Sequence, residues 1–335
     1  MKHRLFSLFF TFCLLLSLCS CGGSAPVQGA VTSTGTMPAE DLNTLSVGAG
    51  IVARDSVAEE QIYEFVSALF SQQEALAAAH PLGDKLDLAF ASSVTDVPYH
   101  PGAARYFAEQ GYEVDSKEGA GTAAPANLTL STGSNAGNYY TFGNAICEQV
   151  NAVSEFAVNP VSSGGSKANL EALQAGEADL CFVQSDILNY ACSGQRLFGT
   201  AYQDCSVVAA LYTEQLQILT NDPEVTTVDQ LRGKRVSIGV SGSGVYYNAL
   251  DVLSAYGLTE QDIQPVYQAF GDSAKGLQEG SIDAAIIVAG IPTPAVASLA
   301  GESSVSMVAM DEEHIRALID SNPYYSESVI PALTY

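Results

Sequence analysis

Short apolar segments typical of strands alternate with helix-like segments along most of this chain. The expected strands are Leu45–Val52, Leu128–Ser131, Phe156–Asn159, Leu180–Val183, Val207–Leu211, Gln215–Leu219, Arg235–Ile238, Ile263–Tyr267, Ala284–Val288 and Val305–Met310. Between them apolar residues recur every three or four positions, as in Tyr139–Val150, which predicts helices. This alternation indicates an α/β fold of mostly parallel sheets with helices on both faces.

The chain also divides into units. The polar segment Thr220–Val228 contains a proline and is a plausible point for the chain to cross between two α/β units. A second polar stretch, Ser116–Ala126, is rich in Gly and Ala and reads as a linker. The pattern therefore predicts two lobes, with an internal linker inside the first.

The N-terminus has the pattern of a bacterial export signal. Cationic residues precede the apolar run Leu5–Leu18, and small residues and Cys21 follow it. The run is shorter than the roughly 20 residues that a spanning helix needs. It resembles a lipoprotein signal, which implies a signal peptide over residues 1–20, lipidation of Cys21 and a flexible tether over residues 21–42. The protein is then extracytoplasmic and lipid-anchored to the cell membrane; an ordinary secretory signal and a retained membrane helix are the alternatives.

Composition narrows the class further. The chain has 37 Asp and Glu against 13 Lys and Arg, a formal charge of −24. This charge excludes nucleic acid as a partner, because such partners need basic surfaces. Strong negative charge also favours a soluble, self-repelling monomer.

Four cysteines follow the signal: Cys147, Cys181, Cys192 and Cys205. No pair has metal-ligand spacing. Cys192 and Cys205 lie in loop-like sequence and could form a disulfide outside the cytoplasm. The spacing leaves the bridged and the free state both open.

The strongest functional signal is a set of Gly/Ser-rich turns. Three turns, within 131–137, 162–166 and 240–244, each join a strand to a helix. In open α/β sheets ligands bind beyond the carboxyl ends of strands, and helix N-termini favour anions. Gly also lets the backbone approach a ligand closely. Any one such turn is more often structural, but three at matching positions predict a cleft between the lobes.

Catalytic patterns do not emerge. None of the turns has the spacing of a P-loop or a dinucleotide site. His80 and His100 each precede a proline, and His314 lies in an acidic helix start, which favours packing or solvated roles. We expect no enzyme activity, no catalytic residue, no metal and no cofactor.

The succession of motifs resembles a known family. The segments that carry the resemblance are Leu130–Gly133, Ser162–Ser166, Gly176–Leu180, Phe182–Asp186, Asp229–Gly239, Ser241–Gly244, Gly280–Ala284, Val288–Thr293 and Ile330–Tyr335. Together they are similar to the TAXI-type solute receptors of TRAP transporters. The resemblance implies a two-lobed, type II periplasmic-binding-protein-like fold with a ligand cleft between the lobes.

The order of the segments is unusual. Residues 41–112 resemble the C-terminal region of such receptors, which suggests a circular permutation; an idle fused remnant is the alternative. Lobe 1 is then 43–213, composed of 43–115, the linker 116–126 and 127–213, and lobe 2 is 214–335. We expect one covalent crossover, pairing of the first strand near Tyr335, a tether that enters lobe 1 at the hinge, and a free C-terminal end.

The resemblance also implies the binding residues. They are Thr132, Gly133, Ser134, Tyr139, Ser163, Gly164, Gly165, Gln184, Ser185, Ser241, Ser243, Gly244, Gly290 and Pro292. The ligand expected is a small anionic solute such as glutamate, glutamine or a dicarboxylate. Cations are scarce near these loops, which favours a carboxylate held by N–H and O–H donors. Membrane subunits of a TRAP transporter are the expected partners; the alternative is a lipid-anchored sensor or surface-interaction protein not coupled to transport.

Overall fold

The computed structural model describes residues 37–335 except residue 197, so Cys21, the predicted signal peptide and most of the tether lie outside the described residues. The strands are β1 (Leu42–Arg54), β2 (Asn127–Ser131), β3 (Ala157–Val161), β4 (Leu180–Gln184), β5 (Cys205–Thr220), β6 (Arg235–Ser237), β7 (Gln264–Val266), β8 (Ala284–Ala289), β9 (Ser306–Met307) and β10 (Ser326–Ile330). The α-helices are α1 (Glu59–Ser71), α2 (Gln73–Ala79), α3 (Leu88–Ala91), α4 (Pro101–Glu109), α5 (Asn138–Asn151), α6 (Ser166–Ala175), α7 (Ser185–Ser193), α8 (Gly244–Ala255), α9 (Phe270–Glu279), α10 (Pro294–Glu302) and α11 (Glu312–Ser321). Short 3₁₀ turns are η1 (Pro81–Lys85), η2 (Val228–Leu231) and η3 (Glu260–Asp262).

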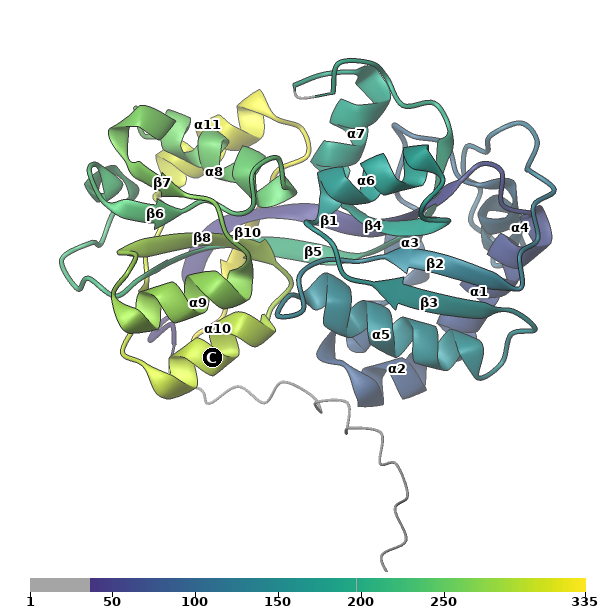
Figure 1. Cartoon of the computed structure of the whole chain (residues 1–335), viewed down its shortest axis with the longest axis horizontal. Helices are drawn as coiled ribbons and strands as arrows, with labels where there is room; N and C mark the ends of the chain where they lie inside the picture. Colours follow the sequence, from purple (N-terminus) through teal and green to yellow (C-terminus); the bar gives the residue numbers. More distant parts are fainter. Residues whose placement is uncertain (1–36, 197) are drawn as a thin grey trace, which may run out of the picture.

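All of these strands belong to one sheet, in the order β3-β2-β4-β1-β5-β8-β6-β7, with β10 on β1 and β9 on β5. Strands β2, β3 and β4 are mutually parallel, as are β6, β7 and β8. Strands β1 and β5 run antiparallel to each other and to their neighbours. Figure 1 shows these two long strands extending between two groups of elements, each with helices on both faces. The α/β prediction and the two-lobed arrangement are confirmed.

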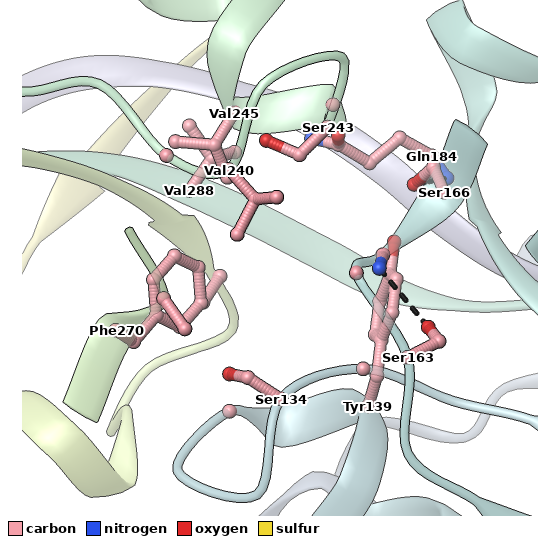
Figure 2. A pocket seen from close by; sticks show the side chains of 18 of the residues that line it. Ser134, Tyr139, Ser163, Ser166, Gln184, Val240, Ser243, Val245, Phe270 and Val288 are labelled. Carbon is pink, nitrogen blue, oxygen red and sulfur yellow. Dashed lines mark hydrogen bonds between the residues drawn. The ribbon is translucent and has the colours of Figure 1, made fainter. Parts of the chain in front are cut away.

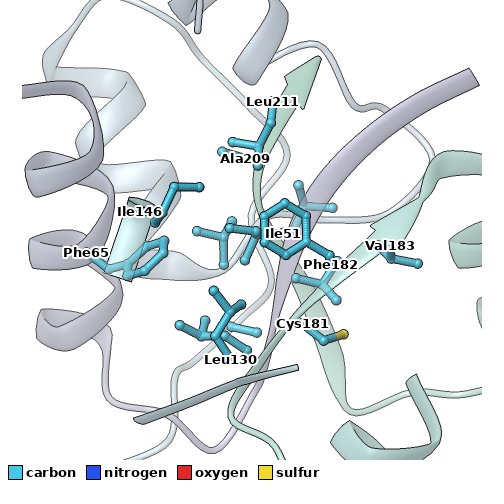
Figure 3. Close-up of a cluster of buried hydrophobic side chains, with 14 of the residues drawn as sticks. Ile51, Phe65, Leu130, Ile146, Cys181, Phe182, Val183, Ala209 and Leu211 are labelled. Carbon is cyan, nitrogen blue, oxygen red and sulfur yellow. The ribbon is translucent and has the colours of Figure 1, made fainter. Parts of the chain in front are cut away.

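The first lobe has a single large core. Residues of β1, β4 and β5, such as Ile51, Phe182 and Ala209, form one cluster with Phe65 of α1 and Ile146 of α5 (Figure 3). Burial of each large apolar side chain contributes roughly 1.5–3 kcal/mol, so this cluster holds the lobe together. Elements before and after the linker both contribute, which is the packing that the permutation hypothesis requires.

The second lobe packs its sheet between two smaller clusters. Val236 and Ile286 face α8 and α11, and Ala285 and Ile287 face α9 and α10. The first half of β1 joins this lobe, because Leu45 is in its core. Residues 43–47, assigned to lobe 1 from the sequence, are thus shared between the lobes.

The crossing point differs from the one predicted at Thr220–Val228. Two expected strands are one continuous strand, β5, which starts in the first core and ends in the second. Val225 and Val228 are buried in the second core, so the segment 220–228 lies wholly within lobe 2. A continuous strand forms because β1 and β8 pair with β5 on either side of the crossing.

The chain ends also differ from expectation. Strand β1 pairs with β10, as predicted for the first strand near the chain end. However, Met37 N–H donates to the Tyr335 carbonyl at 2.6 Å, and Tyr335 N–H donates to the Met37 carbonyl at 2.8 Å. The Tyr335 side chain is fully buried, and its hydroxyl donates to Gln217 at 2.6 Å. The described chain therefore begins beside lobe 2 rather than lobe 1, and Tyr335 is fixed rather than free.

The internal linker lies against lobe 1. Ala58 N–H donates to the Ala123 carbonyl at 2.9 Å, and Gly121 N–H donates to the Asp55 carbonyl at 2.7 Å. A Cβ at Gly121 would overlap the backbone of Ser56, so this close approach requires glycine. The stretch predicted as a linker is thus hydrogen-bonded to the turn after β1.

Both lobes use the same junction between a helix and a buried strand. Asp179 accepts from Arg54 at 2.6 Å, and Asp283 accepts from Arg235 at 2.5 Å. Each aspartate also accepts a backbone N–H from the neighbouring strand. These contacts give both aspartates a structural role.

Candidate functional site

A cavity of about 560 Å³, counting the space at its open mouth, lies between the two lobes. The N-terminal ends of α5 and α6 reach it from lobe 1, and those of α8 and α9 reach it from lobe 2. The first N–H groups of a helix have no partner within the helix, and the helix dipole makes this end positive. The cavity wall therefore presents several N–H donors suited to a carboxylate.

Many of the residues predicted from the Gly/Ser turns line this cavity. They are Gly133, Ser134, Tyr139, Ser163, Gly164, Gly165, Gln184, Ser243 and Gly244. Figure 2 shows Ser134, Tyr139 and Ser163 facing Ser243 and Val240 of the other lobe across the opening. Their role in binding stays a prediction, but the fold gathers them around one space.

Five predicted residues lie elsewhere. Thr132 is buried and donates to the Val161 carbonyl at 2.7 Å, so it joins β2 to the strand beside it. Ser185 accepts from Gly48 N–H at 3.2 Å on β1. Ser241 is exposed outside the lining.

The remaining two, Gly290 and Pro292, lie at contacts between the lobes. A Cβ at Gly290 would lie 3.0 Å from atoms of Leu82 and Tyr212, so glycine permits a close contact between lobes. The Pro292 carbonyl accepts from Asn138 Nδ2 at 3.1 Å. These residues position the walls of the cavity without lining it.

Glycine is required at two points of the lining. Gly165 precedes α6 with a φ of 101°, a conformation that side chains disfavour. At Gly244 the Gln184 amide oxygen occupies the position that a Cβ would take. The Gln184 side chain can cross to lobe 2 only because residue 244 has no side chain.

A buried carboxyl group forms part of the cavity wall. Glu214 of β5 is only 3 % exposed, and the Tyr139 hydroxyl donates to its Oε2 at 3.1 Å. Tyr139 stacks on Phe182 with ring centroids 4.9 Å apart, which fixes the phenol. Among the described residues that line the cavity there is no Lys, Arg or His. Burial therefore raises the pKa of Glu214 well above its usual range, and Tyr139 opposes this only in part.

Further polar atoms of the lining have no hydrogen-bond partner among the residues that the structure describes. They are Asn138 Oδ1, Gln184 Oε1 and Gln268 Nε2. A buried polar atom without a partner costs about 1–3 kcal/mol. The amide oxygens of Asn138 and Gln184 are acceptors, like the Glu214 carboxyl. The cavity therefore offers acceptors on side chains and backbone N–H donors at helix N-termini.

A second polar cluster lies beside the cavity, between α7 of lobe 1 and α8 of lobe 2; we call it the interlobe cluster. It consists of Asp186, Asn248, Tyr325, Asp251 and Arg196. Asn248 Nδ2 donates to Asp186 and to the Tyr325 hydroxyl, each at 2.9 Å, and its Oδ1 accepts from Gln184 at 3.1 Å. Tyr325 and Arg196 both contact Asp251, at 2.9 and 2.8 Å. Burial raises the pKa of Asp186 to about 6.

Sequence reasoning missed several lining residues. They are Gly137, Asn138, Ser166, Glu214, Gly239, Val240, Val245, Gln268, Ala269, Phe270, Val288 and Ala289. Three of them lie inside the predicted turns (Gly137, Ser166 and Val240) and three directly adjoin them (Asn138, Gly239 and Val245), so a wider selection around each turn would have found these six. Glu214 gives one signal in the sequence, because it is an acidic residue between the two expected strands Val207–Leu211 and Gln215–Leu219.

The described residues contain no group of three or more His, Cys, Asp or Glu arranged to hold a metal ion. Ring nitrogens of His80 and His100 accept backbone N–H groups at the starts of η1 and α4, and His314 pairs with Asp311. These contacts give the histidines structural partners. Among the helices described, none combines the length and apolarity that crossing a bilayer requires.

Residues 27–111 and 130–335 match the model of the NMT1-like family. The chain belongs to the NMT1-like family. The interval between the two matched parts contains the predicted linker 116–126. That this NMT1-like protein is a TAXI-type receptor remains a hypothesis from the motif resemblance.

Solved structures give weaker similarities. The aliphatic sulphonate binding protein SsuA from Escherichia coli is 21% identical over 56% of this chain and 57% of its own, with a TM-score of 0.36. SsuA from Xanthomonas axonopodis pv. citri, bound to MOPS, is 22% identical over 57% of this chain and 63% of its own, with a TM-score of 0.40. The GluR0 ligand-binding core from Nostoc punctiforme with L-glutamate is 14% identical over 61% and 84%, with a TM-score of 0.36. The NMT1-like chain thus spans less than two thirds of the length of either SsuA protein.

Proposed function

We propose that this NMT1-like protein is an extracytoplasmic solute-binding receptor that closes its lobes on a small α-amino acid. The observation that carries the proposal is the pairing, in one cavity, of helix N-termini with the buried carboxyl of Glu214. Helix N–H groups suit the carboxylate of an amino acid, and Glu214 suits its ammonium group.

Glu214 narrows the ligand class expected from the sequence. A carboxylate-bearing solute remains part of the proposal, but a dicarboxylate without an amine brings no cation to Glu214. Burial favours the protonated form of Glu214 while no cation is near it, and an ammonium group beside it would lower its pKa and restore a charge pair. A zwitterion instead supplies the cation that the lining lacks. Glutamine and glutamate both fit this description, and succinate and 2-oxoglutarate do not.

Closure between two lobes supports binding rather than turnover. The lining comes from both lobes, and the lobes are joined by β1 and β5. Domain closure around a ligand is the usual working motion of such an arrangement. No nucleophile with an adjacent base is found among the described lining residues.

The test is a calorimetric and thermal-shift screen of the full chain against amino acids, dicarboxylates and oxoacids. We expect saturable binding of at least one L-amino acid and none of the matching acid that lacks the amine. Ligand at 100 times its dissociation constant should stabilise the protein by about 2.7 kcal/mol. Tight binding of a dicarboxylate, together with no binding of any amino acid, would overturn the proposed ligand class. No binding of any compound in the screen would overturn the receptor proposal.

The membrane partner is a separate part of the proposal. The motif resemblance supports a TRAP-type transporter, and the predicted lipid anchor at Cys21 would keep the receptor at the same membrane. Copurification with TRAP membrane subunits would support transport, and an ABC-type permease in their place would change only the transporter class. A sensor kinase as the partner would instead support the alternative of a ligand sensor.

A further inference from the structure

Residues 194–204, of which the structure describes all but residue 197, connect α7 to β5 in lobe 1, and we call them the strap; Arg196 in the strap contacts lobe 2. Cys192 in the last turn of α7 and Cys205 at the start of β5 stand at the two ends of the strap, and their sulfurs are 4.0 Å apart. Cys205 is buried and Cys192 is half-buried. The two thiols that bound the strap are thus neighbours, and one of them is accessible.

The strap carries a contact between the lobes. Arg196 donates to both carboxylate oxygens of Asp251 on α8, at 2.8 and 3.0 Å. Its guanidinium lies 4.6 Å from the ring centre of Tyr190 in lobe 1 and 5.6 Å from that of Tyr247 in lobe 2. The cation therefore fills a space whose walls come from both lobes.

The backbone of Arg196 is unusual. Its φ is 53°, in the left-handed region that non-glycine residues rarely adopt. Such a conformation persists only where the surroundings fix it. Nearby, Gln195 N–H donates to the Tyr190 carbonyl at 2.8 Å, and Tyr202 N–H donates to the Ala191 carbonyl at 2.9 Å. Both bonds tie the strap to α7, next to Cys192.

We propose that Cys192 and Cys205 form a disulfide in the exported protein, and that this bond fixes the strap so that Arg196 pairs with Asp251 across the lobes. The proposal rests on the extracytoplasmic location in the proposed function, because disulfides persist in oxidising compartments. It does not depend on which solute is bound. The bond would join the two ends of a short loop, which restricts the strap whether the lobes are open or closed.

The chemistry is an exchange with the disulfide of a thiol–disulfide oxidoreductase. The Cys192 thiolate attacks one sulfur of that disulfide and expels the other as a thiolate. The Cys205 thiolate then attacks Cys192 and expels the second oxidoreductase sulfur. One S–S bond forms here and one breaks in the donor, which leaves as a dithiol with two electrons and the two protons lost by the cysteines. Contact with Cys205 lowers the pKa of Cys192, which suits it to the first attack.

The first test is peptide mapping of the full chain, exported under its own N-terminus and alkylated without a reductant. We expect a linked peptide pair that contains Cys192 and Cys205, with Cys147 and Cys181 recovered as free thiols. Recovery of alkylated Cys192 and Cys205 from the unreduced protein would overturn the proposal. Neither result depends on solute binding, so this test and the ligand screen fail independently.

The second test uses trypsin, which cuts after Arg196. We expect slow cleavage in the oxidised chain and cleavage about tenfold faster in Cys192→Ala/Cys205→Ala. Asp251→Asn should also speed this cut, whereas Cys147→Ala and Asp262→Asn, matched changes away from the strap, should not. A cut oxidised chain should migrate as one species until it is reduced. If the double variant does not fold, wild type with and without a mild reductant gives the same comparison, and equal rates would overturn the role of the bond.

Discussion

The cavity and the interlobe cluster are neighbours in one interface, yet their polar atoms are satisfied to different degrees. In the cluster, Asn248 uses both ends of its amide, and Asp186 and Asp251 each accept from a partner. In the cavity, Glu214 has one hydroxyl partner and no cation, and further polar atoms have none. Gln184 belongs to both regions: its Nε2 joins the cluster, while its Oε1 has no partner.

This difference in hydrogen bonding suggests that the interlobe cluster stabilises lobe closure and the cavity selects the ligand. A fully paired network stabilises the closed arrangement of the lobes without any ligand. An unpaired buried lining carries a free-energy cost that a complementary ligand removes. Substitutions in the cluster should therefore change how readily the lobes close, and substitutions in the cavity should change which solute is preferred.

The largest effect is expected for Glu214→Gln. We expect affinity for the preferred amino acid to fall by about 100- to 1000-fold, since truncating one partner of a buried charge pair costs 2–5 kcal/mol. Glutamine keeps an acceptor for Tyr139, so the lobe should still fold. Isothermal calorimetry against an amino acid and its oxoacid checks the result, with the exposed Glu224→Gln as control. An unchanged preference for the amine would show that Glu214 does not contact it.

The next effect is expected for Asn248→Ala. Removing this amide leaves Asp186, Tyr325 and Gln184 without a shared partner, so the closed form loses roughly 1.5–3 kcal/mol. Apparent affinity should fall about 10- to 100-fold for every ligand alike, because only the closed form binds tightly. The control is Asn151→Ala, which loses bonds to Val158 inside lobe 1 and should lower Tm without changing affinity. A change in ligand preference would contradict the division of tasks.

Sequence patterns predicted the lobes better than the interface between them. Local periodicity located most strands and helices, and the Gly/Ser turns located most of the cavity rim. The crossing was missed because exposed Thr213 and acidic Glu214 interrupt the apolar run of β5. Burial of a carboxyl depends on Tyr139 and on strands distant in sequence, which no local pattern records. The pairing of Met37 with Tyr335 is likewise a contact between the two ends of the described chain.

A smaller effect is expected on the pH dependence of stability. Burial raises the pKa of Asp186 to about 6, above its usual value of 3.8, while Asn248, Tyr325, Tyr190, Asp251 and Arg196 surround it. The folded state then holds this proton more tightly than the unfolded state, so its contribution is favourable below about pH 4 and is lost as the pH rises through 6. Glu214 acts in the same direction.

We therefore expect the difference in unfolding free energy between Asp186→Asn and wild type to change with pH. It should shift in favour of the variant by roughly 2–3 kcal/mol as the pH rises from 4 to 8. Urea unfolding at several pH values measures this difference. The exposed Asp115→Asn should follow wild type throughout. A constant difference between Asp186→Asn and wild type across the range would show that the carboxyl is solvated or paired in the folded state.

The smallest effect is expected for Gln268→Ala, on the lobe 2 side of the cavity. Gln268 Nε2 is a buried donor without a partner, so a ligand acceptor there would form one neutral hydrogen bond, which contributes about 0.5–1.5 kcal/mol. Affinity should fall about 3- to 10-fold. Gln268→Glu tests the direction of the bond, because a carboxylate would lose the donor and repel a ligand carboxylate. If Gln268→Glu lowers the affinity for an amino acid with a side-chain amide less than the affinity for the matching amino acid with a side-chain carboxylate, residue 268 faces the side chain of the ligand. Equal losses of affinity would place residue 268 at the α-carboxylate that both ligands share.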